Sequence, residues 1–401
     1  MDETEELLKR IHRNDPKLKH AGLSCRSLTL RQIKILSEAL KINSTLQILW
    51  LNGNGLGNCH EGMGLLSEAL KVNNTLQELM LDCNNLGGCP NSPGIKFLSE
   101  ALKTNKTLRT LGLSGNNLGG CNDSSGMFSL SEALKVNNYL RVLDLNRNNL
   151  GNCPESLKFL SEALKVNIAL QELVLSNNNL GDHPGSPGLI SFLEALRVNT
   201  SIWNMDLSSN NIGNYPKAMF SLAETLKINI TIRSLGLYGN NIGGCSDSPG
   251  VKFLSEALKV NNSLQELWLG GNNLGKYPES MKLLSESLKV NNSIKLLDLG
   301  GNNLGNCPES LGFIAEVLKI NNTLQCVDLS YNNLGNCDEG MNLLSESLKV
   351  NSSIKHLWFC GEILNETVLD EIYGALERNK HNNKLKNCCL FGLLLPILKI
   401  V

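Results

Sequence analysis

The segment that most resembles a chemical site is GGNNLGK at residues 270–276. Its glycines and lysine are spaced as in a loop that binds nucleotide phosphates, but Tyr277 stands where such a loop has serine or threonine. The same letters recur along the chain, so we interpret the segment as part of a structural repeat. The six histidines show no metal-ligand spacing, and no nucleophile–base arrangement emerges. The sequence therefore predicts no catalytic residue, no metal site and no cofactor.

Cysteine is the other reactive residue type, and the chain contains thirteen. Seven of them occupy one slot, three residues after the last leucine of a repeated motif, whereas His183, Tyr215 and Tyr277 fill that slot elsewhere. A slot that accepts Cys, His or Tyr is a packing position and not half of an obligatory disulfide, so we expect reduced, mostly buried thiols. The seven cysteines are Cys59, Cys89, Cys121, Cys153, Cys245, Cys307 and Cys337.

The repeated motif is clearest at residues 170–180, LQELVLSNNNL, which reads L-x-x-L-x-L-x-x-N-x-L. In a short strand, Leu173 and Leu175 would face one side, and Glu172, Val174 and Ser176 the other. One such segment cannot bury its apolar side alone, so it requires neighbours of the same kind.

Ten full copies of the motif follow one another, always 30 or 32 residues apart, between a divergent first copy and a degenerate twelfth. We expect the recurrent asparagine to bond backbone groups left free where each coil bends. The first apolar anchors are Leu46, Leu76, Leu108, Leu140, Leu170, Ile202, Ile232, Leu264, Ile294 and Leu324. The asparagines are Asn54, Asn84, Asn116, Asn148, Asn178, Asn210, Asn240, Asn272, Asn302 and Asn332.

The second half of each repeat has helical spacing, as in residues 65–73, LLSEALKVN. Its apolar residues share one face, Glu68 and Lys71 stand three apart on the solvent side, and Asn73 is expected to cap the helix. Strand, turn and helix in about 30 residues predict an α/β solenoid in the shape of a right-handed horseshoe, with a parallel sheet on the concave face and helices on the convex face. The pattern resembles leucine-rich repeats of the ribonuclease-inhibitor subtype, also found in NOD-like receptors.

Variable positions between the motif leucines are the candidate site, because the strands of such an array line its concave face. We number them from the first anchor and consider positions three, five, seven and eight. Position five holds Trp50, Met80, Trp268 and Trp358 in some repeats and aspartate in others, and aromatic side chains that a core does not need are common interface anchors. Packing between adjacent strands is the alternative role for these tryptophans. The predicted partner-binding residues are Trp50, Met80, Asp82, Asp144, Arg147, Glu172, Asp206, Tyr238, Glu266, Trp268, Asp298, Asp328, Tyr331 and Trp358.

Acidic residues gather at the same positions, although the net charge of the chain is only −1. Arg147 alone opposes them when His20 and His356 are taken as neutral, so we expect an acidic groove suited to a basic partner surface and no affinity for nucleic acid. A structural role is the alternative for the aspartates at position five. The acidic residues are Glu78, Asp82, Asp144, Glu172, Asp206, Glu266, Asp298 and Asp328.

We divide the chain into an N-terminal capping helix (1–17), an array of about twelve repeats of 28–32 residues (18–384), and a truncated repeat with an apolar cap (385–401). The start lacks an apolar signal segment and no run reaches the roughly 18 apolar residues of a membrane span, so we expect a cytoplasmic protein. The tail CCLFGLLLPILKIV (388–401) most simply covers the last repeat. A lipid anchor at Cys388 or Cys389, or a dimer contact, is the alternative.

These features predict a non-enzymatic scaffold that binds a protein partner on its concave face. The resemblance leaves three narrower possibilities open. One is an inhibitor of a basic enzyme, similar to the ribonuclease inhibitor. Another is a GTPase activator that resembles the Ran-activating proteins, and the third is a sensor in immunity or host interaction.

Overall fold

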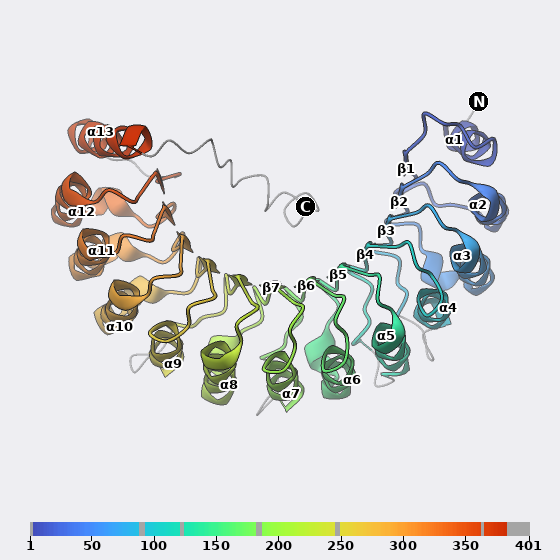
Figure 1. The fold of residues 1–401 in the computed structure, drawn as a ribbon, viewed down its shortest axis with the longest axis horizontal. Helices are drawn as coiled ribbons and strands as arrows, with labels where there is room; N and C mark the ends of the chain where they lie inside the picture. The colour runs from blue at the N-terminus through green and yellow to red at the C-terminus, as the bar shows by residue number, and fades with distance from the viewer. Residues whose placement is uncertain are drawn as a thin grey trace.

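The computed structural model describes residues 3–87, 93–120, 124–181, 187–244, 249–361 and 365–382. Twelve strands form one parallel sheet in which each strand pairs with the next in sequence. Figure 1 shows them along the inside of a horseshoe, with the helices outside. The predicted α/β horseshoe is therefore confirmed, whereas the proposed cap at 385–401 lies outside the described residues.

Each strand has three residues, at positions three to five of the motif. The strands are β1 (His20–Gly22), β2 (Ile48–Trp50), β3 (Glu78–Met80), β4 (Thr110–Gly112), β5 (Val142–Asp144), β6 (Glu172–Val174), β7 (Asn204–Asp206), β8 (Ser234–Gly236), β9 (Glu266–Trp268), β10 (Leu296–Asp298), β11 (Cys326–Asp328) and β12 (His356–Trp358).

The helices lie side by side on the outside. They are α1 (Glu3–His12), α2 (Leu30–Ile42), α3 (His60–Val72), α4 (Pro93–Leu102), α5 (Ser125–Val136), α6 (Pro154–Leu164), α7 (Pro187–Leu196), α8 (Pro216–Ile228), α9 (Pro249–Leu258), α10 (Pro278–Val290), α11 (Pro308–Ile320), α12 (Asp338–Val350) and α13 (Glu366–Asn382). Short 3-10 helices precede six of them: η1 (Leu56–Asn58), η2 (Leu150–Asn152), η3 (Ile212–Asn214), η4 (Leu274–Lys276), η5 (Leu304–Asn306) and η6 (Leu334–Asn336).

The core lies between the sheet and the helices. Leu173 and Leu175 are completely buried in it, as are their counterparts in neighbouring repeats. Leu8 and Ile11 of α1 join the same core at its N-terminal end. Alternation along each strand thus sends positions four and six inward and leaves positions three and five on the concave side.

A ladder of buried asparagines joins the coils where the strands end. The Asn178 amide group donates to the carbonyls of Leu145, Leu175 and Ser176 at 2.8, 3.0 and 3.1 Å. Its Oδ1 accepts the N–H groups of Asn148 and Leu150 at 3.0 and 3.2 Å. The expected bonding to bent backbone is confirmed, and each amide serves two neighbouring coils.

A second asparagine ladder follows the helices. In the coil of α3, the Asn73 backbone N–H bonds to the Ala69 carbonyl, which makes Asn73 the predicted C-cap. Its side-chain amide also donates to the Leu40 carbonyl at 2.7 Å, and its Oδ1 accepts the Leu76 N–H at 2.8 Å. This second ladder therefore holds each helix end against the preceding one.

Two expectations need correction, one about where a helix begins and one about the burial of the cysteines. Helix α3 begins at His60, five residues before the start predicted from apolar spacing, because its first turn is mostly polar. The cysteine slot is the residue just before this helix, so Cys59 lies at the helix N-terminus and is half-buried. Cys153 and Cys307 are likewise half-buried, and Cys337 is buried, so "mostly buried" was an overestimate. The described cysteines are all free thiols.

Candidate functional site

Parallel register places the position-five residues in one row along the concave face. Trp50 pairs with Met80 in the next strand, Asp144 with Val174, and Asp298 with both Trp268 and Asp328. The three tryptophans do not meet. Seven strand spacings separate β2 from β9 and three separate β9 from β12, or about 34 and 14 Å along the sheet at about 4.8 Å per step. Only a partner as large as a protein could contact all three.

The two outer tryptophans are held by neighbours on the same face. Trp50 is 40 % exposed, its indole N–H donates to a Glu78 carboxylate oxygen at 3.0 Å, and its ring meets the edge of His20. The Trp358 ring stacks on His356 with centroids 5.8 Å apart. Both rings are thus oriented by polar or aromatic contacts and remain partly open to solvent. Packing between strands and partner binding are compatible at these positions.

The aspartates at position five have a structural task as well. One carboxylate oxygen of each accepts the backbone N–H two residues later, as in Asp144 to Asn146 at 2.8 Å and Asp298 to Gly300 at 2.7 Å. Asp206 and Asp328 make the same bond. This bond stabilises the turn at the end of the strand. These aspartates therefore have the structural role that was the alternative to partner binding, and this role uses one oxygen of each carboxylate.

Burial without a neighbouring cation is the main electrostatic property of the concave carboxylates. Burial raises the pKa of Asp82 and of Asp298 to about 6, and that of Asp144 to about 7. Burial also raises the pKa of Glu172, against a hydrogen bond from Asn204. Repulsion adds to the effect, because Asp82 and Asp206 raise the pKa of Asp144, and Asp328 raises that of Asp298.

Within the described residues, none of the eight concave carboxylates forms an ion pair. Asp82 is the extreme case. It is 2 % exposed, its Oδ1 accepts the Ser114 N–H at 2.8 Å, and its Oδ2 has no partner. A cation brought to this face would relieve the cost of keeping such groups charged.

Position eight carries a signal that sequence reasoning missed. Its backbone is left-handed in every described coil, and glycine fills it at Gly53, Gly115, Gly239, Gly271, Gly301 and Gly361. Arg147 and Tyr331 nevertheless occupy it, with φ of 54° and 56°, and their side chains are exposed. Large side chains are strained in this conformation. The other coils have cysteine, asparagine or serine at this position. The identity of each residue was visible in the sequence, but the sign of φ was not.

Tyr238 lies at position seven and is also exposed. Glycine in the next coil leaves room for its ring, because a Cβ at Gly270 would lie 2.7 Å from it. Tyr331 similarly covers Gly361, where a Cβ would lie 2.4 Å from the ring. The two tyrosine rings therefore lie against glycines of the next coil and extend the aromatic surface near Trp268 and Trp358.

Two hollows occur elsewhere in the described part of the chain. One, of about 460 Å³, lies between α1 and the first coil and includes Glu6, Arg10 and Arg26. The other, of about 320 Å³, lies beside the starts of β2 to β4 and includes Gln47, Gln77 and Arg109. Neither contains a predicted site residue. Within the described ranges, no group of three or more histidine, cysteine or acidic side chains is placed to hold a metal ion.

Comparison with known families agrees with this architecture. A family described as "Leucine Rich repeat" matches residues 104–120 and 321–341, and one described as "Leucine Rich Repeat" matches 139–160 and 169–191. The chain folds as a leucine-rich repeat solenoid. Each matched segment begins in the loop before a strand and includes that strand and its ladder asparagine.

Solved structures similar to the solenoid include the leucine-rich repeat-containing protein LegL7 from Legionella pneumophila. It is 22 % identical with a TM-score of 0.55, and the match covers 80 % of this chain and 95 % of that one. A structure of leiomodin-1 actin-binding site 2 matches with 18 % identity and a TM-score of 0.30 over 50 % of this chain and 90 % of that one. A search of curated proteins gives no match. None of the described helices has the length and apolarity to cross a membrane.

Proposed function

We propose that the solenoid is a non-enzymatic scaffold that binds a protein with a basic surface on its concave face. The observation that carries the proposal is the row of concave carboxylates without ion pairs among the described residues, with raised pKa values at Asp82, Asp144 and Asp298. Cationic side chains of a partner would lower these pKa values, and binding would therefore release protons. The free thiols suit a reducing compartment, so we place this function in the cytoplasm.

Aromatic side chains supply the apolar part of the proposed interface. Trp50, Trp268 and Trp358 would be anchors, and Tyr238 and Tyr331 would extend the surface between them. Their separation along the sheet favours a broad, rigid partner over a short peptide. Arg147 and Tyr331 support the same proposal, because exposed bulky residues at a left-handed position that the other coils fill with glycine or a small residue are more simply explained by contact with a partner than by folding.

The test replaces Trp50, Trp268 and Trp358 with alanine and measures affinity for the partner recovered by affinity capture with the unaltered chain. We expect a loss of at least about 100-fold, because anchors of this kind contribute about 2 kcal/mol or more each. Trp203→Gln is the matched control. Trp203 lies at position two, where other coils have glutamine, as at Gln171 and Gln265. Unchanged affinity in the folded triple variant would refute concave binding.

Inhibition of a basic enzyme is the narrower candidate that the acidic face favours. Pancreatic-type ribonuclease is a suitable probe, because it is basic and its activity is easily followed. Loss of ribonuclease activity at stoichiometric amounts of the solenoid, restored in the triple tryptophan variant, would support this form. Full activity in excess solenoid would exclude it and leave the broader scaffold proposal to the capture experiment.

A further inference from the structure

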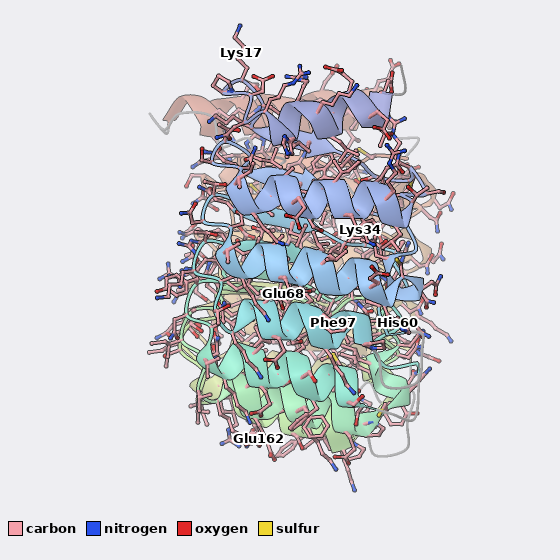
Figure 2. All side chains as sticks on the ribbon, turned by 90° about the vertical axis from the view of Figure 1, so that its right-hand side faces the viewer. Lys17, Lys34, His60, Glu68, Phe97 and Glu162 are labelled. Carbon is pink, nitrogen blue, oxygen red and sulfur yellow. The ribbon has the colours of Figure 1, made fainter. Side chains whose placement is uncertain are left out.

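A second surface with a distinct chemistry runs along one edge of the solenoid. It consists of the eleven loops that lead from helices α2 to α12 to the strand that follows each helix, such as residues 72–77 and 166–171. Figure 1 looks down the shortest axis of the molecule, so these loops lie on one of the two broad sides of the horseshoe. In Figure 2, His60, the first residue of α3, lies at the right-hand edge of the view, and the loops that follow the helix ends form the opposite edge. We call this surface the strand-start edge.

Aliphatic side chains project from nearly every loop of the strand-start edge. The residue directly before the recurrent asparagine is valine or isoleucine in ten of eleven loops, and each is between 50 and 69 % exposed. Asparagine bonds between successive loops, such as Asn199 to the Asn167 carbonyl at 3.1 Å, keep these residues in line. The ten residues are Ile42, Val72, Val136, Val166, Val198, Ile228, Val260, Val290, Ile320 and Val350.

In the middle of the row, residues more apolar than those of the other repeats occupy two positions. The residue after the capping asparagine is usually polar, as at Asn74, Asn138 and Asn262, but it is isoleucine at 168 and 230. Ile168 and Ile230 are 73 and 75 % exposed, the highest values among the large hydrophobic residues of the described chain. Trp203 lies in the coil between them, at a position that elsewhere holds glutamine, arginine or lysine. Three neighbouring coils therefore form an apolar patch that folding does not require.

Charge on the strand-start edge has one sign. The eleven loops, from residues 42–47 to residues 350–355, contain no aspartate or glutamate. Six cations lie in them, five at position two of the strand motif and one, Lys106, earlier in its loop. Three of the loops are followed directly by a glutamate at position three of the strand motif, on the concave face: Glu78, Glu172 and Glu266. The acids that precede the loops are helix glutamates such as Glu162, which pairs with Lys165 on the convex side. The six cations are Lys106, Arg109, Arg141, Arg233, Lys295 and Lys355.

We propose that the strand-start edge lies on the surface of an anionic lipid bilayer, with Ile168, Trp203 and Ile230 at the centre of the contact. Three features favour a bilayer over an acidic protein. The cations and aliphatic residues extend over eleven coils, well beyond the footprint of a standard protein interface. The apolar residues project from the edge and do not line a groove, so they suit a deformable apolar layer. The loops occupy a broad side of the horseshoe, which matches an extended surface.

The physical basis is the usual one for peripheral attachment. Cations near an anionic leaflet gain attraction that falls with salt, and apolar side chains enter the region between headgroups and acyl chains. Tryptophan at that depth keeps its indole N–H near water while its ring is buried. In this orientation the concave face stays open at the side, so the proposal is independent of the partner that the concave face binds.

The experiment is co-sedimentation of the full chain with vesicles of phosphatidylcholine alone or with one quarter phosphatidylserine. We expect binding to the anionic vesicles only, and weaker binding as salt rises from about 0.05 to about 0.3 M. The first variant combines Ile168→Asn with Ile230→Asn, which restores the residue found in the sister loops and so preserves the fold. We expect the partition coefficient to fall about tenfold.

A second variant combines Arg233→Gln with Lys295→Gln, again residues that sister coils carry. It should lower binding to the anionic vesicles about tenfold or more and reduce the dependence on salt. Phe220→Asn is the matched control, because Phe220 is an exposed aromatic on the convex face and Asn342 holds the equivalent place in α12. This variant should bind as the unaltered chain does.

Two results would overturn the proposal. One is no binding to anionic vesicles, which would leave an acidic protein as the occupant of the edge. The other is binding that both edge variants leave unchanged, which would place the lipid contact elsewhere on the chain. The tryptophan variant of the concave face should retain vesicle binding, so failure of one proposed site is distinguishable from failure of the other.

Discussion

The convex and concave faces carry acidic residues in opposite states. On the convex face, glutamate and lysine three residues apart on one helix pair directly, as Glu68 and Lys71 do at 2.6 Å, and ten such pairs occur among the described residues. On the concave face, Asp82, Asp144 and Asp298 are largely buried, without ion pairs, and have raised pKa values. Charge that a coil neutralises by itself serves solubility, whereas charge left without a counterion is available to a partner.

Curvature explains the difference. Strands crowd together on the inside of the horseshoe, so a carboxylate at position five is covered by the side chains of two neighbouring strands. Helices spread apart on the outside, where exposed pairs contribute only about 0.3–0.5 kcal/mol each. The same residue type therefore costs stability inside and is nearly neutral outside.

Both faces depend on the asparagine ladder, so replacing one ladder residue should have the largest effect. Asn178→Ala would leave the backbone groups bonded by its side chain, including the Leu145 carbonyl and the Asn148 N–H, buried without those bonds. At about 1–3 kcal/mol for each buried polar group left unsatisfied, and with partial rescue by water, we expect a loss of about 4 kcal/mol. Urea unfolding followed by circular dichroism measures it.

The neighbouring Asn179 provides the control. Its backbone has φ of +58° and its side chain is half-buried, so Asn179→Gly keeps the favoured conformation and should change the free energy of unfolding by less than about 0.5 kcal/mol. Equal losses at 178 and 179 would show that the buried amide is not what joins the coils.

Much of the fold followed from spacing alone. Residues equivalent to Leu173, Leu175 and Asn178 recur at fixed intervals. A residue type that recurs in every coil has a structural role that every coil shares. The strand, the core face and the ladder could therefore be predicted. The start of α3 at His60 could not, because its polar first turn has no apolar period to reveal it.

For a related reason, the sequence predicts which residues form the candidate site but not their burial or their backbone conformation. Sequence places Asp144 and Trp50 in one row, but burial depends on neighbouring coils and on curvature, so the raised pKa of Asp144 could not be inferred. The positive φ of Tyr331 is a backbone property that its side chain hides. The helical spacing of the repeat gives no sign that Val166 lies beyond the end of α6, and only the folded chain reveals that it belongs to an exposed row.

The concave face should make stability depend on pH. Asp144 has a pKa of about 7 in the folded chain, against about 3.9 when unfolded, so between these values the native state holds a proton that the unfolded state releases. Its contribution to stability is complete below about pH 4 and is lost as the pH rises through 7. Asp82 and Asp298 act in the same direction up to about pH 6.

Asp144→Asn tests this dependence, because the amide oxygen can still accept the Asn146 N–H. We expect the variant to be more stable than the unaltered chain by about 4 kcal/mol at pH 8, and equal to it near pH 4. Unfolding by urea at a series of pH values measures the difference. A variant that keeps the full pH slope would mean that Asp144 is ionised throughout and that the concave face is better solvated than its burial implies.

The smallest effect is expected on the convex face, from Glu68→Gln. This change removes the ion pair with Lys71 but keeps a helix-forming side chain of the same length. We expect a loss of about 0.3–0.5 kcal/mol at low salt, little loss at about 0.5 M salt, and no change in the pH slope that Asp144 produces. Binding of a basic partner on the concave face should also be unchanged. A loss above about 1 kcal/mol, or one that salt does not reduce, would mean that the convex pairs stabilise the stacking of the coils. The charges of the two faces would then differ in burial but would both contribute substantially to the free energy of unfolding.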